Sequence, residues 1–542
     1  MFPPKEFLSL SSPGKLREKL SFLREKVDPF PSGKDKSFFQ RPETFLFIFY
    51  ALLTLLMTLF HEVWRDEAQG FLIVRDLPLL PLIRQLRMEA HFPLWYLLIF
   101  PFVKLGLPVM GVALIHWLLS AILAWIVLEK FPFRLLTRAA LVFTYPLFFE
   151  FSVIARNYTA GFLLVALLLL LWKNLWDHPY LAALLLSLVL LSDLFFAGPI
   201  LGFCLCILRQ AVIQKRLKSK EFLIPCVMIF LAALAGFLLL CGQHGASPDK
   251  PFPPLIANAL QVLGRDVSVR LLNPFTATSE LFGLPPAILV FLPFLVLFQL
   301  RKSKEAMLFF CTTLGFTFLA FVLGGFSEMR HASFFLAGGV VSFVLAEWDS
   351  PKEEKGAAWY EPLLFLLFFL PVFWSVLFLA GKSVTALKSE ILYDFSHGKY
   401  AAKFIERNAP SLPLFCTDTA YCTPVMACLP PRKIFSLLSK TSQTFSLWKD
   451  LPSGEGMNIP DEVVKNLPAE ADCGLYLCMV YGLPRKGAPN LFLLYSSLNE
   501  RAGAWGHPEE CYFLLLIVRP EKARFYREKF PLYEPEIFPA AQ

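Results

Sequence analysis

The sequence predicts a mainly α, polytopic membrane protein with a soluble α/β domain at its C-terminal end. Of its 542 residues, 56% are hydrophobic and 57 are Phe, which is too apolar for a soluble multidomain protein. The apolar residues form runs close to the length of about 20 residues that crosses a bilayer. After Gly381 these runs end and the composition becomes that of a soluble domain.

The net charge of +8 does not indicate nucleic-acid binding. Lys and Arg residues cluster in short segments between the apolar runs, a pattern that orients membrane helices. Residues 1–43, expected to be a cytoplasmic segment, lack the apolar core and small-residue cleavage site of a signal peptide. The first helix is therefore expected to stay in the mature protein.

About eleven apolar runs are long enough, or nearly long enough, to span a membrane, and together they define a membrane region over residues 44–381. They lie at residues 44–61, 109–128, 136–152, 159–175, 180–194, 196–210, 222–241, 284–300, 306–323, 331–347 and 362–381. A further run at 93–106 is shorter and has Lys104 near its end. It is expected to lie flat along the membrane interface.

The basic clusters test this arrangement. With the run at 93–106 lying flat, the clusters around Arg134, Arg216 and Lys302 fall on the same side as the basic N-terminal segment. The positive-inside rule then places the N-terminus in the cytoplasm and the C-terminus outside. The unusual polar residues of four loops share the outer face: Asp66, Glu67, Arg84, Arg87 and His91; Glu150, Arg156, Asn157 and Tyr158; Asp193; and Glu328, Arg330 and His331.

Residues 382–542 are expected to form the extracytoplasmic α/β domain. Apolar stretches of strand length alternate with helix-like segments. The predicted strands are 412–416, 474–480 and 511–518, and the predicted helices are 400–408, 419–429 and 521–530. Six of the eleven Cys residues lie here, and they are either disulfide-bonded or small buried hydrophobic residues. No Cys spacing predicts a zinc site.

Two adjacent carboxylates, Asp66 and Glu67, follow the first apolar run. Ionisable residues at the edge of a membrane helix are candidates for function. The alternative is a charged cap that ends the span and faces water. This stretch alone favours neither interpretation. The other polar residues expected on the same outer face favour a functional site.

The ordered set of polar motifs resembles the GT-C superfamily of polytopic glycosyltransferases, which includes the protein O-mannosyltransferases and the aminoarabinose transferases of lipid A. It is most similar to a bacterial branch with Trp-Arg-Asp-Glu-Ala-Gln, Ala-Arg-Asn-Tyr and a late Arg-His. The motifs are Trp64 to Gln69, a His-x-Pro-x-x-Tyr stretch at His91 to Tyr96, Ala155 to Tyr158, and Arg330-His331. The resemblance covers about residues 44–350.

The resemblance implies a bacterial cytoplasmic (inner) membrane enzyme that moves a sugar from a polyprenyl-phosphate donor to a hydroxyl of a glycan, lipid or protein on the outer face, usually with inversion. Asp66 is the expected general base. Glu67 is either the alternative base or, with His91, a ligand of a divalent metal ion. The family's usual His-Pro-Pro reads His91-Phe92-Pro93 here, which leaves the metal open.

Arginine suits the leaving phosphate because its planar fork donates two hydrogen bonds. Arg330 is the first candidate and Arg156 the second, although either side chain could instead extend from a span to the interface. The remaining candidate substrate contacts are His91, Tyr96, Tyr158, Asp193 and His331. Their alternatives are interfacial aromatic residues for the tyrosines and a helix cap for Asp193.

Two other classes of function compete with the enzyme. A lipid or sugar transporter would place charges near the bilayer midplane and often carries internal repeats, whereas here the unusual charges share one face and no repeat is evident. A non-catalytic assembly or receptor protein would use the C-terminal domain and would tolerate Asp66→Asn.

Overall fold

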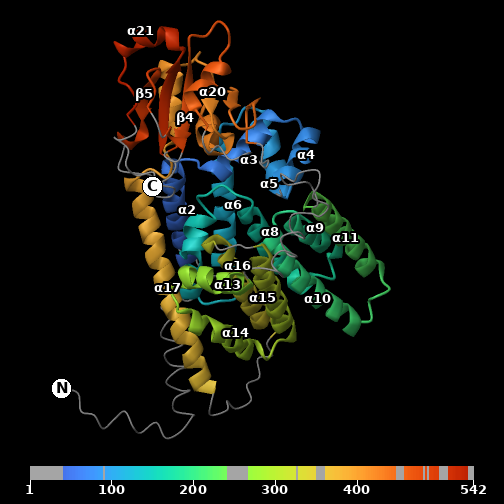
Figure 1. Cartoon of the computed structure of the whole chain (residues 1–542). Helices are drawn as coiled ribbons and strands as arrows, with labels where there is room; N and C mark the ends of the chain where they lie inside the picture. Colours follow the sequence, from blue (N-terminus) through green and yellow to red (C-terminus); the bar gives the residue numbers. More distant parts are fainter. Residues whose placement is uncertain are drawn as a thin grey trace, which may run out of the picture.

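The computed structural model describes residues 41–89, 92–240, 267–324, 328–349, 361–446, 457–479, 482–484, 487–499 and 511–534. Helices dominate, and a six-stranded sheet follows them near the C-terminal end. In Figure 1 the helices of the membrane region form one body, and the sheet stands above it. The predicted fold class is confirmed: the protein is a mainly α membrane protein with a C-terminal region that contains helices and a sheet.

Seven helices within the described ranges are long and apolar enough to cross a membrane. These are α2 (Pro42–Phe60), α6 (Val109–Lys130), α10 (Ala197–Ile213, with the preceding turn), α11 (Lys220–Leu240), α15 (Lys304–Gly324), α16 (Met329–Asp349) and α17 (Glu361–Leu392). The helices α13 (Val267–Phe282) and α14 (Pro286–Leu300) add an eighth span if they count as one, although the chain bends by 88° between them.

Three of the eleven expected spans do not form helices of spanning length. The run at 136–152 divides into α7 (Leu135–Val142) and a π-helical turn, η2 (Pro146–Glu150), because Pro146 removes a backbone donor. The runs at 159–175 and 180–194 give α8 (Tyr158–Leu171) and α9 (Pro179–Leu190), which have 14 and 12 residues. Helices of this length are shorter than a bilayer core of about 30 Å.

Three short helices lie between the first span and α6. They are α3 (Arg65–Asp76), α4 (Leu79–Glu89) and α5 (Leu94–Lys104). In Figure 1 they sit together between the membrane helices and the sheet. With 11 residues, α5 is too short to span, as expected for the run at 93–106.

The C-terminal sheet has the strand order β3-β2-β1-β4-β6-β5. Its strands are β1 (Leu414–Cys416), β2 (Ile434–Ser436), β3 (Thr441–Gln443), β4 (Cys473–Met479), β5 (Leu491–Ser496) and β6 (Tyr512–Val518). β1 pairs in parallel with β2 and β4, and the other neighbours are antiparallel. Continuous burial along β4 and β6 shows that both faces of the central sheet are covered.

The three predicted strands correspond to β1, β4 and β6. The predicted helices correspond to α18 (Gly398–Asn408), α19 (Thr423–Cys428) with the turn before it, and α21 (Ala523–Arg527) with the turn before it. The sequence analysis missed β2, β3, β5 and α20 (Ile459–Lys465). The ten described Cys residues are all free, so no disulfide forms among them.

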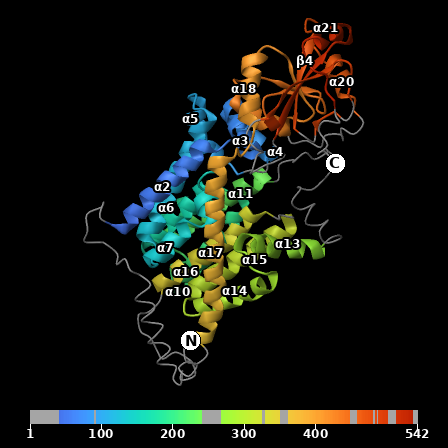
Figure 2. The same cartoon turned by 90° about the vertical axis from the view of Figure 1, so that its left-hand side faces the viewer.

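The membrane region and the sheet are joined in two ways. α17 is 32 residues long and continues past the expected boundary at Gly381 to the base of the C-terminal region, as Figure 2 shows. The helix α3 also packs against α19, and one buried core combines residues of α3, α4 and α5 with residues of the sheet. The C-terminal region is therefore built onto the first loop of the membrane region.

Gln69 is the main polar contact at this junction. Its side-chain amide donates to the Ser446 carbonyl at 2.7 Å and accepts from the Ser446 N–H at 2.9 Å. It also donates to Glu89 at 3.1 Å. Both Gln69 and Ser446 are buried, so neither finds water as a substitute.

Gln69→Ala is expected to weaken the docking of the C-terminal region. The substitution leaves the buried N–H and C=O of Ser446 without these partners, which costs about 1–3 kcal/mol. Thermal unfolding and limited proteolysis should show a lower melting temperature and faster release of the C-terminal fragment. Gln85→Ala is the matched control, because Gln85 donates to the same Glu89 at 2.8 Å without contacting Ser446. Equal behaviour of the two variants would contradict the assignment.

Candidate functional site

The site begins where α2 ends. The chain runs through residues 61–64 and starts α3 at Arg65, with Trp64 as the N-cap in an extended conformation. Asp66 and Glu67 thus occupy the first turn of α3, where carboxylates interact favourably with the helix dipole. Glu67 accepts the backbone N–H of Trp64 at 3.3 Å, so it is the residue that caps the helix.

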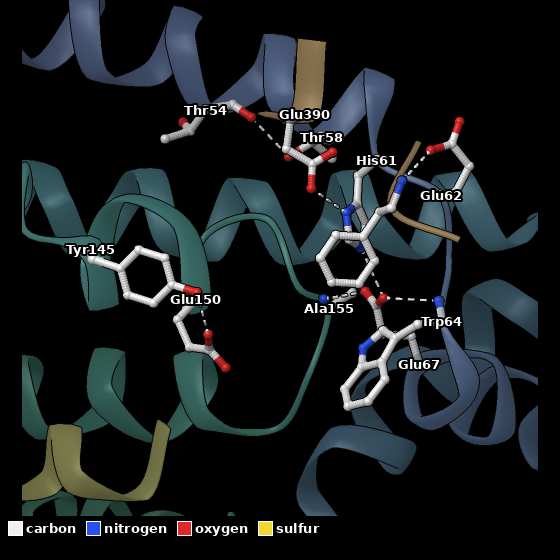
Figure 3. Close-up of polar contacts among 11 residues, drawn as sticks. Thr54, Thr58, His61, Glu62, Trp64, Glu67, Tyr145, Glu150, Ala155 and Glu390 are labelled. Atoms are coloured by element: carbon white, nitrogen blue, oxygen red, sulfur yellow. Dashed lines mark hydrogen bonds and ion pairs between the residues drawn. The ribbon is translucent and has the colours of Figure 1, made fainter. Parts of the chain in front are cut away.

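Glu67 is buried and saturated with contacts. One oxygen lies 2.9 Å from Nε2 of His61, and the other accepts the N–H of Ala155 at 2.6 Å. His61 in turn uses Nδ1 to contact Glu390 at 3.0 Å. Figure 3 shows these side chains meeting between the end of α2, the start of α3 and the end of α17. Glu67 therefore holds the loop together, and both of its oxygens already accept or contact a neighbouring group.

Asp66 has a different environment, with 30% of its side chain exposed. Its Oδ2 lies 2.8 Å from the Arg156 guanidinium and 3.9 Å from that of Arg330. Arg330 also forms an ion pair with Glu328. The structure thus brings together the expected base and both expected phosphate ligands, which are far apart in the sequence.

The two arginines lie near aromatic rings. The guanidinium carbons of Arg156 and Arg330 are 5.7 and 5.5 Å from the centre of the Trp64 ring, within cation–π range. Arg156 is also 5.5 Å from the Tyr158 ring. Burial lowers the pKa of Arg156, but neighbouring acidic groups, of which Asp66 contributes most, together raise that pKa above its ordinary value. Two guanidinium groups and one partly open carboxylate therefore meet beside the Trp64 ring.

Asp193 and His331 lie beside this group. The Asp193 side chain accepts the N–H of Phe195, so it caps a short helical turn, and it also accepts from Asn157 at 2.8 Å. His331 contacts the Tyr158 hydroxyl through Nε2 at 3.2 Å. The cap that was the alternative for Asp193 is present in the structure, and its bond to Asn157 supports the segment that carries Arg156.

Tyr96 and His91 are the remaining expected substrate contacts. Tyr96 is buried in the core between α3 and α5, where its ring lies next to Gly70. His91 is outside the described residues. The sequence analysis also assigned no role to His61 or Glu390. Glu390 gave no sequence signal, because it sits in a polar stretch after Gly381 that was assigned to the soluble domain.

The expected metal site of Glu67 and His91 stays a prediction, because His91 lies outside the described residues. Both oxygens of Glu67 already accept hydrogen bonds, one of them from the buried Ala155 N–H. Among the residues that the structure describes, no group of three His, Cys, Asp or Glu side chains is arranged to hold a metal ion.

Comparisons with known proteins give no family for this chain. No protein-family model matches the sequence, and a search of curated proteins finds no match. What the chain shows by itself is a multi-pass membrane protein with seven or eight candidate spans and a mixed C-terminal sheet.

Glu62, next to His61, connects this loop to the segment that follows α17. Its side chain is 7% exposed, accepts the Phe395 N–H at 3.1 Å and lies 3.9 Å from Lys399. Burial raises the pKa of Glu62 to about 7, and the charge of Asp394 adds to the increase. The ionised form of Glu62 is therefore the unfavourable one in the folded protein.

Glu62→Gln is expected to stabilise the protein at alkaline pH. Because the folded pKa lies above the unfolded one, the ionised carboxylate destabilises the fold by about 1–3 kcal/mol above pH 7, and this cost vanishes below the unfolded pKa. Melting temperatures measured at pH 8 and pH 4.5 should show a gain for Glu62→Gln at pH 8 only. Glu406→Gln, on the exposed side of α18, should show no such difference. A gain of equal size at both pH values would refute the assignment.

Proposed function

We propose that this protein is a membrane glycosyltransferase that moves a sugar from a polyprenyl-phosphate donor to an acceptor hydroxyl on a glycan, lipid or protein. The observation that carries the proposal is the convergence of Asp66 with Arg156 and Arg330 at one partly open point. A carboxylate beside two arginines offers a proton acceptor and a phosphate-binding pair in one place.

The reaction needs one bond to form and one to break. The acceptor oxygen attacks the anomeric carbon of the sugar while the bond from that carbon to the phosphate oxygen breaks. The electron pair leaves with the polyprenyl phosphate, and the acceptor proton passes to Asp66. Attack from the face opposite the phosphate inverts the anomeric configuration.

The two arginines suit the leaving phosphate. A phosphate that binds Arg156 and Arg330 replaces Asp66 as the anionic partner of both guanidinium groups. Releasing Asp66 from these cations makes it a stronger base, because a nearby positive charge lowers the basicity of a carboxylate. Donor binding would in this way prepare Asp66 for the acceptor proton.

An apolar pocket supports a lipid-linked donor. It lies among α6, η2, α8 and α16, and its lining is almost entirely hydrophobic. Phe151 and Phe162 line it, and the Phe151 ring centre is 5.8 Å from that of Tyr158, which neighbours Arg156 in the chain. A phosphate at the arginines would thus leave its prenyl chain near apolar surface that can receive it.

Asp66→Asn is expected to abolish transfer. Loss of the general base should lower kcat by at least about 100-fold, because amide nitrogen and oxygen do not accept the acceptor proton at neutral pH. The measurement is sugar release from a polyprenyl-phosphate donor by the purified protein in vesicles. Asp76→Asn is the matched control, since Asp76 is also on α3 and pairs with Arg75 at 2.8 Å.

Two results would argue against this assignment. Full transfer by Asp66→Asn would exclude Asp66 as the base. Movement of the lipid between leaflets by the wild type, with no transfer to any hydroxyl acceptor, would favour the transporter instead.

The orientation has its own test. The proposed reaction takes place on the outer face of the bacterial cytoplasmic membrane, with the N-terminus in the cytoplasm. A Cys placed at Glu328 in a cysteine-free background should then react with a membrane-impermeant thiol reagent added from outside, and a Cys placed at Lys302 should not. The opposite pattern would put the site on the cytoplasmic side.

A further inference from the structure

Glu390 is a fully buried carboxylate at the end of α17. Its side chain is 0% exposed, and one of its oxygens lies 3.0 Å from Nδ1 of His61. His61 is itself 3% exposed and sits between this carboxylate and that of Glu67. Figure 3 shows the three side chains in a row. The polar contacts of Glu390 and His61 lead to Glu67, so their role in the proposed reaction is an indirect one.

We propose that Glu390 and His61 are positioning residues for the Asp66 site, acting through Glu67. This inference rests on the proposed glycosyl transfer and deepens it. In this proposal the C-terminal end of α17 supports the segment that carries Asp66, although the two are more than 300 residues apart in the sequence.

Glu67 is the link between this row and the site. Its carboxylate accepts the N–H of Trp64 at 3.3 Å, two residues before Asp66. It also accepts the N–H of Ala155 at 2.6 Å, one residue before Arg156. One side chain therefore fixes both backbone segments that supply the 2.8 Å contact between Asp66 and Arg156.

The direction of the Glu67 carboxylate depends on His61. The 2.9 Å contact from Nε2 holds one Glu67 oxygen, and the 3.0 Å contact at Nδ1 keeps the imidazole ring from turning about its bond to Cβ. The Phe395 ring, 4.4 Å from the imidazole centre, packs against it. Glu390→Gln replaces this charge-assisted contact with a weaker neutral one, so the ring is held less firmly and Glu67 loses part of its fixed partner on that side.

A displaced Glu67 should reduce turnover more than donor binding. The prenyl chain and phosphate are bound by other groups, whereas the acceptor proton must reach Asp66 in a defined geometry. A misplacement of about 1 Å can cost about 100-fold in rate. Glu390→Gln and His61→Ala are therefore expected to lower kcat by about 10- to 100-fold and to change the donor KM by less than about 3-fold.

The experiment measures kcat and KM per folded molecule for Glu390→Gln, His61→Ala and the double variant. If Glu390 acts through His61, the double variant is no slower than the slower single variant. If the fold-loss of kcat in the double variant equals the product of the two single fold-losses, the residues act independently and the proposal is wrong. A fall in melting temperature with unchanged kcat of the folded protein would show a purely structural role and would overturn it as well.

Glu305→Gln is the matched control. Glu305 begins α15 and pairs with Arg209 of α10, remote from the Asp66 site, so this variant removes a paired glutamate of the membrane region and should leave kcat and KM unchanged. A loss of kcat equal to that of Glu390→Gln would contradict a specific role for the row.

A second readout separates this inference from the proposed reaction. Hydrogen–deuterium exchange of the peptide that contains Ala155 needs no substrate. Glu390→Gln should accelerate exchange of the Ala155 amide by about 10-fold or more, and Glu305→Gln should not, because that amide is held by Glu67. If the wild type transfers no sugar but this exchange changes as expected, the reaction is wrong and the coupling stands. Unchanged exchange would overturn the coupling itself.

Discussion

The carboxylate of Glu67 is the contact on which the described site depends. It is buried, and it joins the cap of α3, the segment before α8 and, through His61, the end of α17. A buried carboxylate is costly unless every oxygen has a partner. The contacts that supply those partners bring together three parts of the chain that are far apart in the sequence. Asp66 and Arg156 meet because their neighbours are held there.

The adjacent carboxylates consequently have separate tasks. For this pair the sequence left open a charged cap that ends the span and faces water, or a functional site, and the structure gives the two carboxylates different environments. Glu67 caps α3 and is almost fully enclosed, whereas Asp66 keeps 30% of its side chain exposed and faces two arginines. The side chains differ because successive helical residues point about 100° apart. The Glu67 side chain therefore points into the protein, whereas the Asp66 side chain points toward the opening.

The sequence predicted the parts of this molecule that depend on local pattern. Long apolar runs gave seven of the spans, and strand-length apolar runs gave β1, β4 and β6. Charge bias predicted that the loops of Asp66, Arg156 and Arg330 share one membrane face. The structure brings the three side chains together, and their membrane orientation stays a prediction. Short strands such as β2 and β3 have 3 residues each, too few to show a period.

What could not be predicted depends on contacts between distant segments. Hydropathy does not distinguish the 14-residue helix α8 from a span, since its apolar run continues past the helix end. Glu390 looked like a surface residue after the last span, because the sequence does not show that α17 continues to Leu392 beside the end of α2. Only the packing of α17 against α2 makes that carboxylate buried.

The helix α3 connects the candidate site to the C-terminal sheet region. Its first turn carries Asp66, its middle is docked to Ser446 by Gln69, and near its end Arg75 donates to the carbonyls of Met426 and Leu429. One helix is thus shared between the membrane region and the C-terminal sheet region. A movement of that region would be transmitted to the carboxylate through a rigid helix of 12 residues. The sheet region is for this reason part of what positions the site, although none of the three charged groups at the site comes from it.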